Sequence, residues 1–252
     1  MKNWKSILYT IGGGCLAALA VFLMFSSAKA DEKRMCEGVI VRIKDEDKQL
    51  LVKQADVLQW ATREGTFPLK GMPLSRIKLK TVEQRVESSG IIKECQAYVN
   101  LNGYIILDVE VYKPMARILG NARFPDRYMD ETGHFFPVSK NYTPTVLLLS
   151  GPYFEQIKGL KSEENKDLLE LIQTVANDEF WSAQITRMHV DKHKEIQLEP
   201  LLGEHLIEFG KPLKIRTKLE KLMVFYTKIL PQDAWSKFTE VSVKYDGQIV
   251  CR

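Results

Sequence analysis

The sequence predicts an α+β protein with a single apolar N-terminal helix, a small domain of order β-α-α-β-β, and a strand-rich mixed domain with two helices. Three observations predict it. A run of 19 uncharged residues occupies positions 7–25. Two segments that alternate apolar and polar residues flank an Asn-Gly pair at positions 102–103. Two amphipathic segments, at 162–175 and 213–230, interrupt a later series of short strands.

The composition describes a folded body of nearly neutral charge. Hydrophobic residues make up 45% of the chain, which is enough for a sizeable core. Removing Lys2, Lys5 and Lys29 of the N-terminal region from the 36 basic residues leaves 33, against 32 acidic residues. A body with so small an excess of positive charge has no general electrostatic reason to bind nucleic acid.

The apolar run at 7–25 is long enough to cross a membrane. At about 1.5 Å per residue, a helix of this length spans roughly 28 Å, close to the hydrocarbon thickness of about 30 Å. Residues 1–6 are then a cytoplasmic tail and residues 26–35 a linker. Ala28-Lys29-Ala30 is also typical of a signal-peptide cleavage site, so removal of the segment is the alternative. Both interpretations place the rest of the chain outside the cytoplasm.

The first domain is predicted at 36–114. Alternation from Val39 to Ile43 indicates a strand, and a helix follows near 55–62. A second helix carries its apolar face at Leu79, Val82 and Val86 and ends at Gly90. The hairpin around Asn102-Gly103 is predicted to close with a two-residue type I′ turn, since both of its central residues need positive φ.

The second domain is predicted at 115–252. Asp130-Glu131-Thr132-Gly133 has the composition of a tight turn. Ser162 is a candidate N-cap for a helix, and a later helix is predicted to stop at Pro231. Short strands are expected at 183–190, 195–200 and 205–209, and a closing hairpin joins 238–245 to 248–251 through Asp246-Gly247.

The sequence indicates no catalytic, cofactor or metal site. His189 and His193 have helical spacing, but Asp191-Lys192 between them indicates a turn. Ser150-Gly151-Pro152 ends a strand, and the proline removes an amide that an oxyanion hole would use.

The cysteines form no recognisable scaffold. No C-x-x-C pair occurs, so a structural zinc site or a dithiol redox motif is not indicated. Outside the cytoplasm two of Cys36, Cys95 and Cys251 could pair. Buried, unpaired thiols in strands are the alternative.

The order of these parts resembles the FtsQ/DivIB family of cell-division proteins. The small domain resembles a POTRA domain, and its last strand runs into a proline and a short apolar-basic stretch, as in that family. The residues concerned are Val109, Val111, Lys113, Pro114, Ala116, Arg117 and Ile118. The turn at 130–133, followed by Pro137 and the apolar run 146–149, strengthens the resemblance.

This resemblance implies a non-catalytic scaffold of the division machinery, or divisome. It implies a single-pass protein of the inner membrane, with its N-terminus in the cytoplasm and its body in the periplasm. It therefore favours a retained membrane helix over a cleaved signal peptide.

The resemblance also implies a binding mode. Proteins of this family recruit small bitopic partners of the FtsB/FtsL type, and an edge strand can be completed by a strand from such a partner. The implied surface is Thr239–Tyr245 with Gln248–Val250. The candidate partner-binding residues are Val241, Val243, Tyr245, Gln248, Ile249 and Val250. Alternatively, Val241, Val243 and Tyr245 simply alternate in and out of the domain core.

Two further hypotheses come from other classes of protein. The first is a POTRA-bearing factor for outer-membrane assembly or secretion, which would need further units of this kind. The second is a secreted soluble enzyme released after Ala30.

Overall fold

The computed structural model describes residues 34–44, 50–230 and 238–252. These residues form two compact units that meet between Val111 and Tyr112, whereas the sequence analysis places the boundary after Pro114. Each unit mixes helices and strands, as predicted. The predicted tail, the apolar run and most of the linker lie outside the described residues. Within them, no helix has both the length and the apolar character that crossing a bilayer requires.

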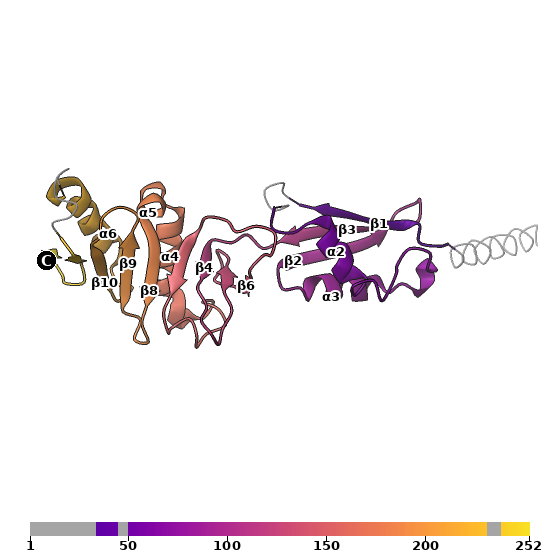
Figure 1. The fold of residues 1–252 in the computed structure, drawn as a ribbon, viewed down its shortest axis with the longest axis horizontal. Coiled ribbons are helices and arrows are strands. Elements are labelled where there is room, and N and C mark those ends of the chain that lie inside the picture. Colours follow the sequence, from indigo (N-terminus) through magenta and orange to yellow (C-terminus); the bar gives the residue numbers. More distant parts are fainter. Residues whose placement is uncertain (1–33, 45–49, 231–237) are drawn as a thin grey trace, which may run out of the picture. The chain divides into compact units, whose positions relative to one another are not determined.

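The first unit has the predicted order β-α-α-β-β (Figure 1). Its elements are β1 Gly38–Ile43, α2 Gln54–Ala61, a 3-10 turn Leu74–Arg76, α3 Leu79–Glu87, β2 Ile92–Val99 and β3 Tyr104–Val111. The sheet order is β1-β3-β2. Strand β1 is parallel to the central β3, and β2 is antiparallel to it.

The core of this unit lies between the sheet and the two helices. Val82 and Val86 are the buried positions of α3, as the sequence pattern predicts. They belong to a set of buried residues that also includes Val57 and Ala61 of α2 and, on the central strand, Ile105, Leu107 and Val109. Alternate residues of β3 therefore face the helices, because successive side chains of a strand point to opposite faces.

The hairpin between β2 and β3 is confirmed, but its predicted turn type is wrong. The loop has three residues, Leu101-Asn102-Gly103. The Gly103 amide donates to the Asn100 carbonyl at 3.1 Å, and the Asn100 amide donates to the Tyr104 carbonyl at 2.9 Å. Only Gly103 in this loop has positive φ, at 81°. This pattern is a type I turn closed by a glycine bulge, so Leu101 occupies the turn instead of extending the strand.

The second unit is built on one nine-stranded sheet of order β12-β11-β10-β9-β8-β7-β4-β5-β6. Its strands are β4 Ala116–Ile118, β5 Arg127–Met129, β6 Phe135–Pro137, β7 Leu147–Ser150, β8 Ile185–Val190, β9 Ile196–Pro200, β10 Leu206–Gly210, β11 Glu240–Ser242 and β12 Val250–Cys251. Most neighbours are antiparallel. The parallel pairs are β4–β7, β7–β8 and β10–β11.

Helices cover one face of this sheet. They are α4 Lys166–Asn177, preceded by a 3-10 turn Glu163–Asn165, then α5 Glu179–Gln184 and α6 Ile215–Val224, which continues as a π-helical turn, Phe225–Ile229. Their apolar stripes join the inward residues of the strands in one core, for example Leu171, Trp181 and Leu222 with Met188 and Phe209. Strands β8 and β9 bury one face and carry polar residues on the other, whereas β5 and β6 are buried on both faces.

The described part of the second unit contains three α-helices, one more than predicted. The extra helix is α5, which Asp178 caps by accepting hydrogen bonds from the amides of Phe180 and Trp181. Ser162 precedes the 3-10 turn and not α4 itself, whose N-cap is Asn165. The turn predicted at Asp130 is confirmed, because the Asp130 carboxylate accepts from the amides at 132 and 134. Pro231 lies outside the described residues.

The closing hairpin is confirmed, but its strands are shorter than predicted. Val241 lies opposite Cys251, and Ser242 lies opposite Val250. Seven residues, 243–249, separate the two strands, with the turn at Asp246-Gly247 in their middle. Gly247 has a φ of 70°, which a glycine adopts without strain.

Candidate functional site

The C-terminal strand β12 lies at one end of the nine-stranded sheet. Its inner neighbour β11 is enclosed, since it pairs with β12 on one side and with β10 on the other. In the part of the chain that the structure describes, no strand pairs with the outer side of β12. This edge is therefore one of the two places, with β6 at the other end, where a strand of another protein could extend the sheet.

The hydrogen bonds of the hairpin show which backbone groups point outward. The Arg252 amide donates to the Glu240 carbonyl at 2.9 Å, and the Glu240 amide donates to the Arg252 carbonyl at 3.2 Å. Such reciprocal pairs alternate along an antiparallel ladder with pairs that exchange no hydrogen bonds. The neighbouring pair, Val241 and Cys251, is of the second kind. The N–H and C=O groups of Cys251 consequently point away from β11, toward the open edge.

Helix α6 holds the loop that leads to this edge. The Lys221 ammonium donates to the carbonyl of Val243 at 2.8 Å, of Tyr245 at 2.6 Å and of Gln248 at 3.4 Å. Lys214 adds an ion pair to Asp246 at 2.6 Å. Charged donors make stronger hydrogen bonds than neutral ones. The loop 243–249 is thus fastened from the inside, and β12 is presented at a defined position.

A second lysine of α6 is buried beneath the neighbouring strand. The Lys218 ammonium donates to the carbonyls of Phe209, at 2.9 Å, and Lys211, at 2.7 Å. Burial lowers the pKa of Lys218, since a low-dielectric environment disfavours the charged form. These bonds satisfy the carbonyls around Gly210, where β10 ends with a φ of 74°. A Cβ at Gly210 would lie 2.8 Å from the Cβ of Lys244, so this close approach requires glycine.

The six residues predicted from the sequence occupy three kinds of position. The side chains of Val241 and Val243 are fully buried in the core. Tyr245 and Gln248 are exposed in the loop, and Ile249 and Val250 are half-buried. The structure thus brings the six together at one corner of the sheet, but places the two valines where their side chains face the core.

Sequence reasoning missed the residues that define and support the edge itself. Cys251 carries the outward backbone groups, and Arg252 closes the pairing with Glu240. The position of Cys251 in the last alternating segment was a usable signal, because the terminal strand of a hairpin often forms a sheet edge. Lys221 had no such signal, since its three carbonyl partners lie at least 22 residues away in the sequence.

The outer edge of β2 in the first unit is arranged differently. Its outward amides at Cys95 and Ala97 donate to the carboxylates of Glu87, at 3.1 Å, and Glu83, at 2.8 Å, on α3. The hydrogen bond from Ala97 is the largest cause that lowers the pKa of Glu83, and Lys80 lowers it further. These side chains occupy the donors that an added strand would need.

The structure places Ser150 and His189 side by side on strands β7 and β8. The Ser150 hydroxyl lies 3.2 Å from Nδ1 of His189, and the two residues are in register. On the other side of His189 the ladder places Gln197, an amide that cannot act as the carboxylate of a catalytic triad. His193 lies in the turn between β8 and β9, so the turn predicted at Asp191-Lys192 is confirmed and the two histidines do not share a helix face. Among the described residues, no group of three possible ligands gathers around a metal position.

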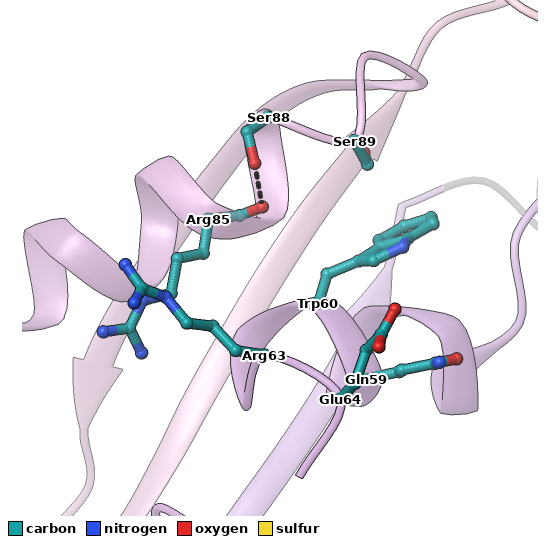
Figure 2. Close-up of a pocket in the computed structure, with 7 residues that line it drawn as sticks. All are labelled: Gln59, Trp60, Arg63, Glu64, Arg85, Ser88 and Ser89. Atoms are coloured by element: carbon teal, nitrogen blue, oxygen red, sulfur yellow. Dashed lines mark hydrogen bonds between the residues drawn. The ribbon is translucent and has the colours of Figure 1, made fainter. Parts of the chain in front are cut away.

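A hollow of about 480 Å³ in the first unit lies where α2 and α3 end (Figure 2). It is lined by Gln59, Trp60, Arg63, Glu64, Arg85, Ser88 and Ser89. Both guanidinium groups lie over the Phe67 ring, at 5.3 and 5.0 Å, and Arg85 also donates to the Ala61 carbonyl at 3.4 Å. Burial and the neighbouring Arg63 lower the pKa of Arg85. Cations at helix C-termini offset the helix dipole, and this structural role accounts for the presence of both arginines.

The three cysteines of the described residues are free thiols. Cys36 and Cys95 are buried in the first unit, and Cys251 is partly buried at the edge of the second. Burial raises the pKa of Cys95 to about 12, which keeps this thiol protonated and unreactive.

The two folds define a protein made of a POTRA-like domain followed by a strand-rich domain that ends in an open sheet edge. Residues 34–110 match the model of the POTRA-like domain, and residues 113–252 match the model described as FtsQ/DivIB, C-terminal related. No curated protein matches this chain significantly. Since the second match covers more than half of the sequence, the chain belongs to the FtsQ/DivIB family. This is a family of non-catalytic cell-division scaffolds that are typically associated with the membrane at the division site.

Proposed function

We propose that this protein is a membrane-anchored division scaffold that captures partners of the FtsB/FtsL type by adding a partner strand to β12. The observation that carries the proposal is the outward direction of the Cys251 backbone groups at the end of the sheet. An added strand gains affinity from main-chain hydrogen bonds and specificity from alternate side chains.

The surroundings of β12 support this use. Lys221 fastens the loop before the strand, so little ordering of the protein is required when a partner binds. Tyr245 is 45% exposed in the loop that leads to this strand, and the Lys244 ammonium lies 5.2 Å from the centre of its ring. An exposed aromatic ring next to an edge strand offers a partner side chain a surface to pack on.

We further propose the topology that such a scaffold needs. Residues 1–6 form the cytoplasmic tail, residues 7–25 the membrane helix and residues 26–35 the linker, with the body outside the cytoplasm. Intact-mass measurement of the membrane fraction tests this, because mature chains that begin at Asp31 would show that the apolar segment had been removed.

The binding mode is tested by Cys251→Pro in the full chain. Proline removes the outward N–H but leaves the pairing with β11, and edge strands tolerate proline. Losing this donor and placing the ring at the edge should weaken co-purification with FtsB/FtsL-type partners by about tenfold or more. Cys251→Ala keeps the N–H and is the matched control.

Two further variants complete this experiment. Val250→Pro should break the pairing between β11 and β12, because the N–H of this residue points inward. A chain that lacks Gln248–Arg252 should lose the partners altogether. Equal co-purification by the Cys251→Pro and Cys251→Ala proteins would contradict strand addition at β12.

Imaging of a fluorescent fusion tests the wider proposal. The fusion should gather at the division site of growing cells. A uniform distribution around the envelope would contradict a role in division and would favour the alternative of an assembly or secretion factor.

A further inference from the structure

The loop between β2 and β3 exposes a leucine at its tip. The Leu101 side chain is 95% exposed. The loop around it is well fixed, since the Asn100 side chain accepts from the amides of Asn102 and Tyr104 at 3.0 and 2.9 Å. Turn positions of this kind usually carry polar residues, and nothing in the loop's hydrogen bonding requires a leucine. The residue is therefore presented to the surroundings and not to the core.

The chain enters the first unit beside this loop. The Arg34 guanidinium donates to the Leu101 carbonyl at 2.8 Å, and the Glu37 amide donates to the Gly103 carbonyl at 3.0 Å. The segment 71–74 lies on the other side, where the Cys36 amide donates to the Met72 carbonyl at 2.9 Å. Three segments thus meet at one end of the sheet. We name this end, residues 34–37, 70–76 and 100–104, the entry end.

The entry end combines exposed apolar side chains with an excess of positive charge. Met35 is 46% exposed, and Tyr104 is also exposed, with its ring against Gly38. The three segments contain the bases Arg34, Lys70 and Arg76 against a single acid, Glu37. Apolar side chains surrounded by basic residues are typical of surfaces that rest on an anionic bilayer.

The length of chain before Arg34 limits how far the entry end can lie from the membrane. The apolar run ends at Phe25, nine residues earlier. Nine residues reach at most about 32 Å when fully extended, since each adds up to about 3.6 Å. The opposite end of the sheet is farther away, because β1 runs parallel to β3 and places Ile43 beside Val109.

We propose that the entry end rests on the surface of an anionic lipid bilayer, with Leu101 in the interface between headgroups and acyl chains. This inference rests on the proposed membrane anchor. It assigns the first unit a fixed end toward the membrane.

The test places an environment-sensitive dye at two ends of the same sheet in the full chain. Cys15→Ala and Cys251→Ser remove two of the four thiols, and the other two, Cys36 and Cys95, are buried. Leu101→Cys carries the NBD dye at the entry end. Lys44→Cys carries it about 20 Å away, since the intervening strand rises about 3.3 Å per residue. Both proteins are reconstituted into vesicles of phosphatidylcholine and phosphatidylglycerol, with and without doxyl-labelled lipid.

The expected result is a blue-shifted emission and strong quenching by doxyl lipid for the dye at 101, with neither effect at 44. Lys70→Glu together with Arg76→Glu should lower the quenching at 101 at least twofold, and unchanged quenching would overturn the assignment to an anionic surface. Equal emission and quenching at the two positions would overturn the proposal as a whole.

Flotation of the same vesicles in alkaline carbonate separates this inference from the proposed anchor. Chains that float while the dye at 101 stays in water retain the anchor and refute the resting surface. Chains that do not float refute the anchor, and the inference with it.

Discussion

The outer edges of β2 and β12 are managed in opposite ways. At β2, two carboxylates of α3 accept the outward amides of Cys95 and Ala97. At β12, the ammonium group of Lys221 instead fastens the carbonyls of the preceding loop, and the outward groups of Cys251 have no strand beside them in the described residues. An unguarded edge is a liability that proteins usually blunt. The difference is consistent with the proposed function, in which the first edge is protected against strand addition and the second is available for it.

The same kind of chemistry produces both outcomes. Side chains of a helix reach over the sheet to backbone groups, but acidic side chains block donors whereas basic side chains hold carbonyls. Because Glu83 and Glu87 are four residues apart, they lie on one face of α3 and meet alternate residues of β2. This match of a helical and a strand period explains how one helix can occupy two successive outward amides of β2.

The largest effect is expected from removing the two carboxylates that accept the outward amides of β2. Glu83→Ala with Glu87→Ala leaves two amides without their partners, which should cost about 2–5 kcal/mol of the unfolding free energy of the first unit. The exposed donors should also promote self-association of the protein. Denaturant unfolding and sedimentation velocity measure the two effects.

The control for this variant is Glu94→Ala, on β2 itself, where the carboxylate accepts only from the Gln96 side chain. It should change stability by less than about 0.5 kcal/mol. A double variant that remains monomeric and as stable as this control would show that the carboxylates do not guard the edge.

A smaller effect is expected from removing the lysine that holds the loop before β12. Lys221→Ala removes the donor shared by Val243, Tyr245 and Gln248, and should lower the unfolding free energy of the second unit by about 1–3 kcal/mol. Hydrogen exchange across 243–252 should accelerate. Arg216→Ala is the control on the same helix, because its ion pair with Glu220 is exposed. Unchanged exchange in the Lys221→Ala protein would mean that the loop is held by other contacts.

The smallest effect is a dependence of stability on pH, which we expect in the second unit and not in the first. His205 is buried just before β10, with Nε2 3.1 Å from the Tyr226 hydroxyl, and burial lowers its pKa. The folded state therefore resists protonation of this ring. The free energy of unfolding of the second unit should be highest above pH 6.5, the ordinary pKa of histidine. It should decline as the pH falls below that value, because the unfolded state then binds a proton that the folded state does not.

Thermal unfolding at pH 7.5 and 5.5 measures this decline. His205→Gln should reduce the difference between the two pH values, whatever its effect on stability at pH 7.5. The first unit should not respond in this window, since the lowered pKa of Glu83 acts only near and below pH 4.5. An unchanged difference in the variant would assign the pH dependence to another group.

Local patterns predicted most of the elements of this fold and little of their arrangement. The helix ending at Glu87 and the hairpin of β2 and β3 follow from apolar spacing and from Asn102-Gly103. The turn type was wrong because only Gly103 takes positive φ. Helix α5 was missed because its six residues are too few for a clear period, although Asp178 offered a capping signal.

The candidate site was predicted in its location but not in its mechanism. Alternation along 238–251 identified a closing hairpin, and the family resemblance pointed to an edge. Which strand forms the edge depends on β11 pairing with β10, a contact between segments more than 30 residues apart. No local pattern encodes such a pairing, so Val241 and Val243 were candidates although their side chains face the core.

The sequence by itself determined the family, the order of the parts, and the apolar run that we propose as the anchor, because these depend on composition and on periods of a few residues. Only the tertiary structure decided which edge is guarded and which is open. Glu83 and Glu87 meet β2, and Lys221 meets the loop 243–249, only after the sheets have formed. Backbone groups become donors or acceptors for a partner according to what folding leaves unpaired, and that is a property of the whole sheet.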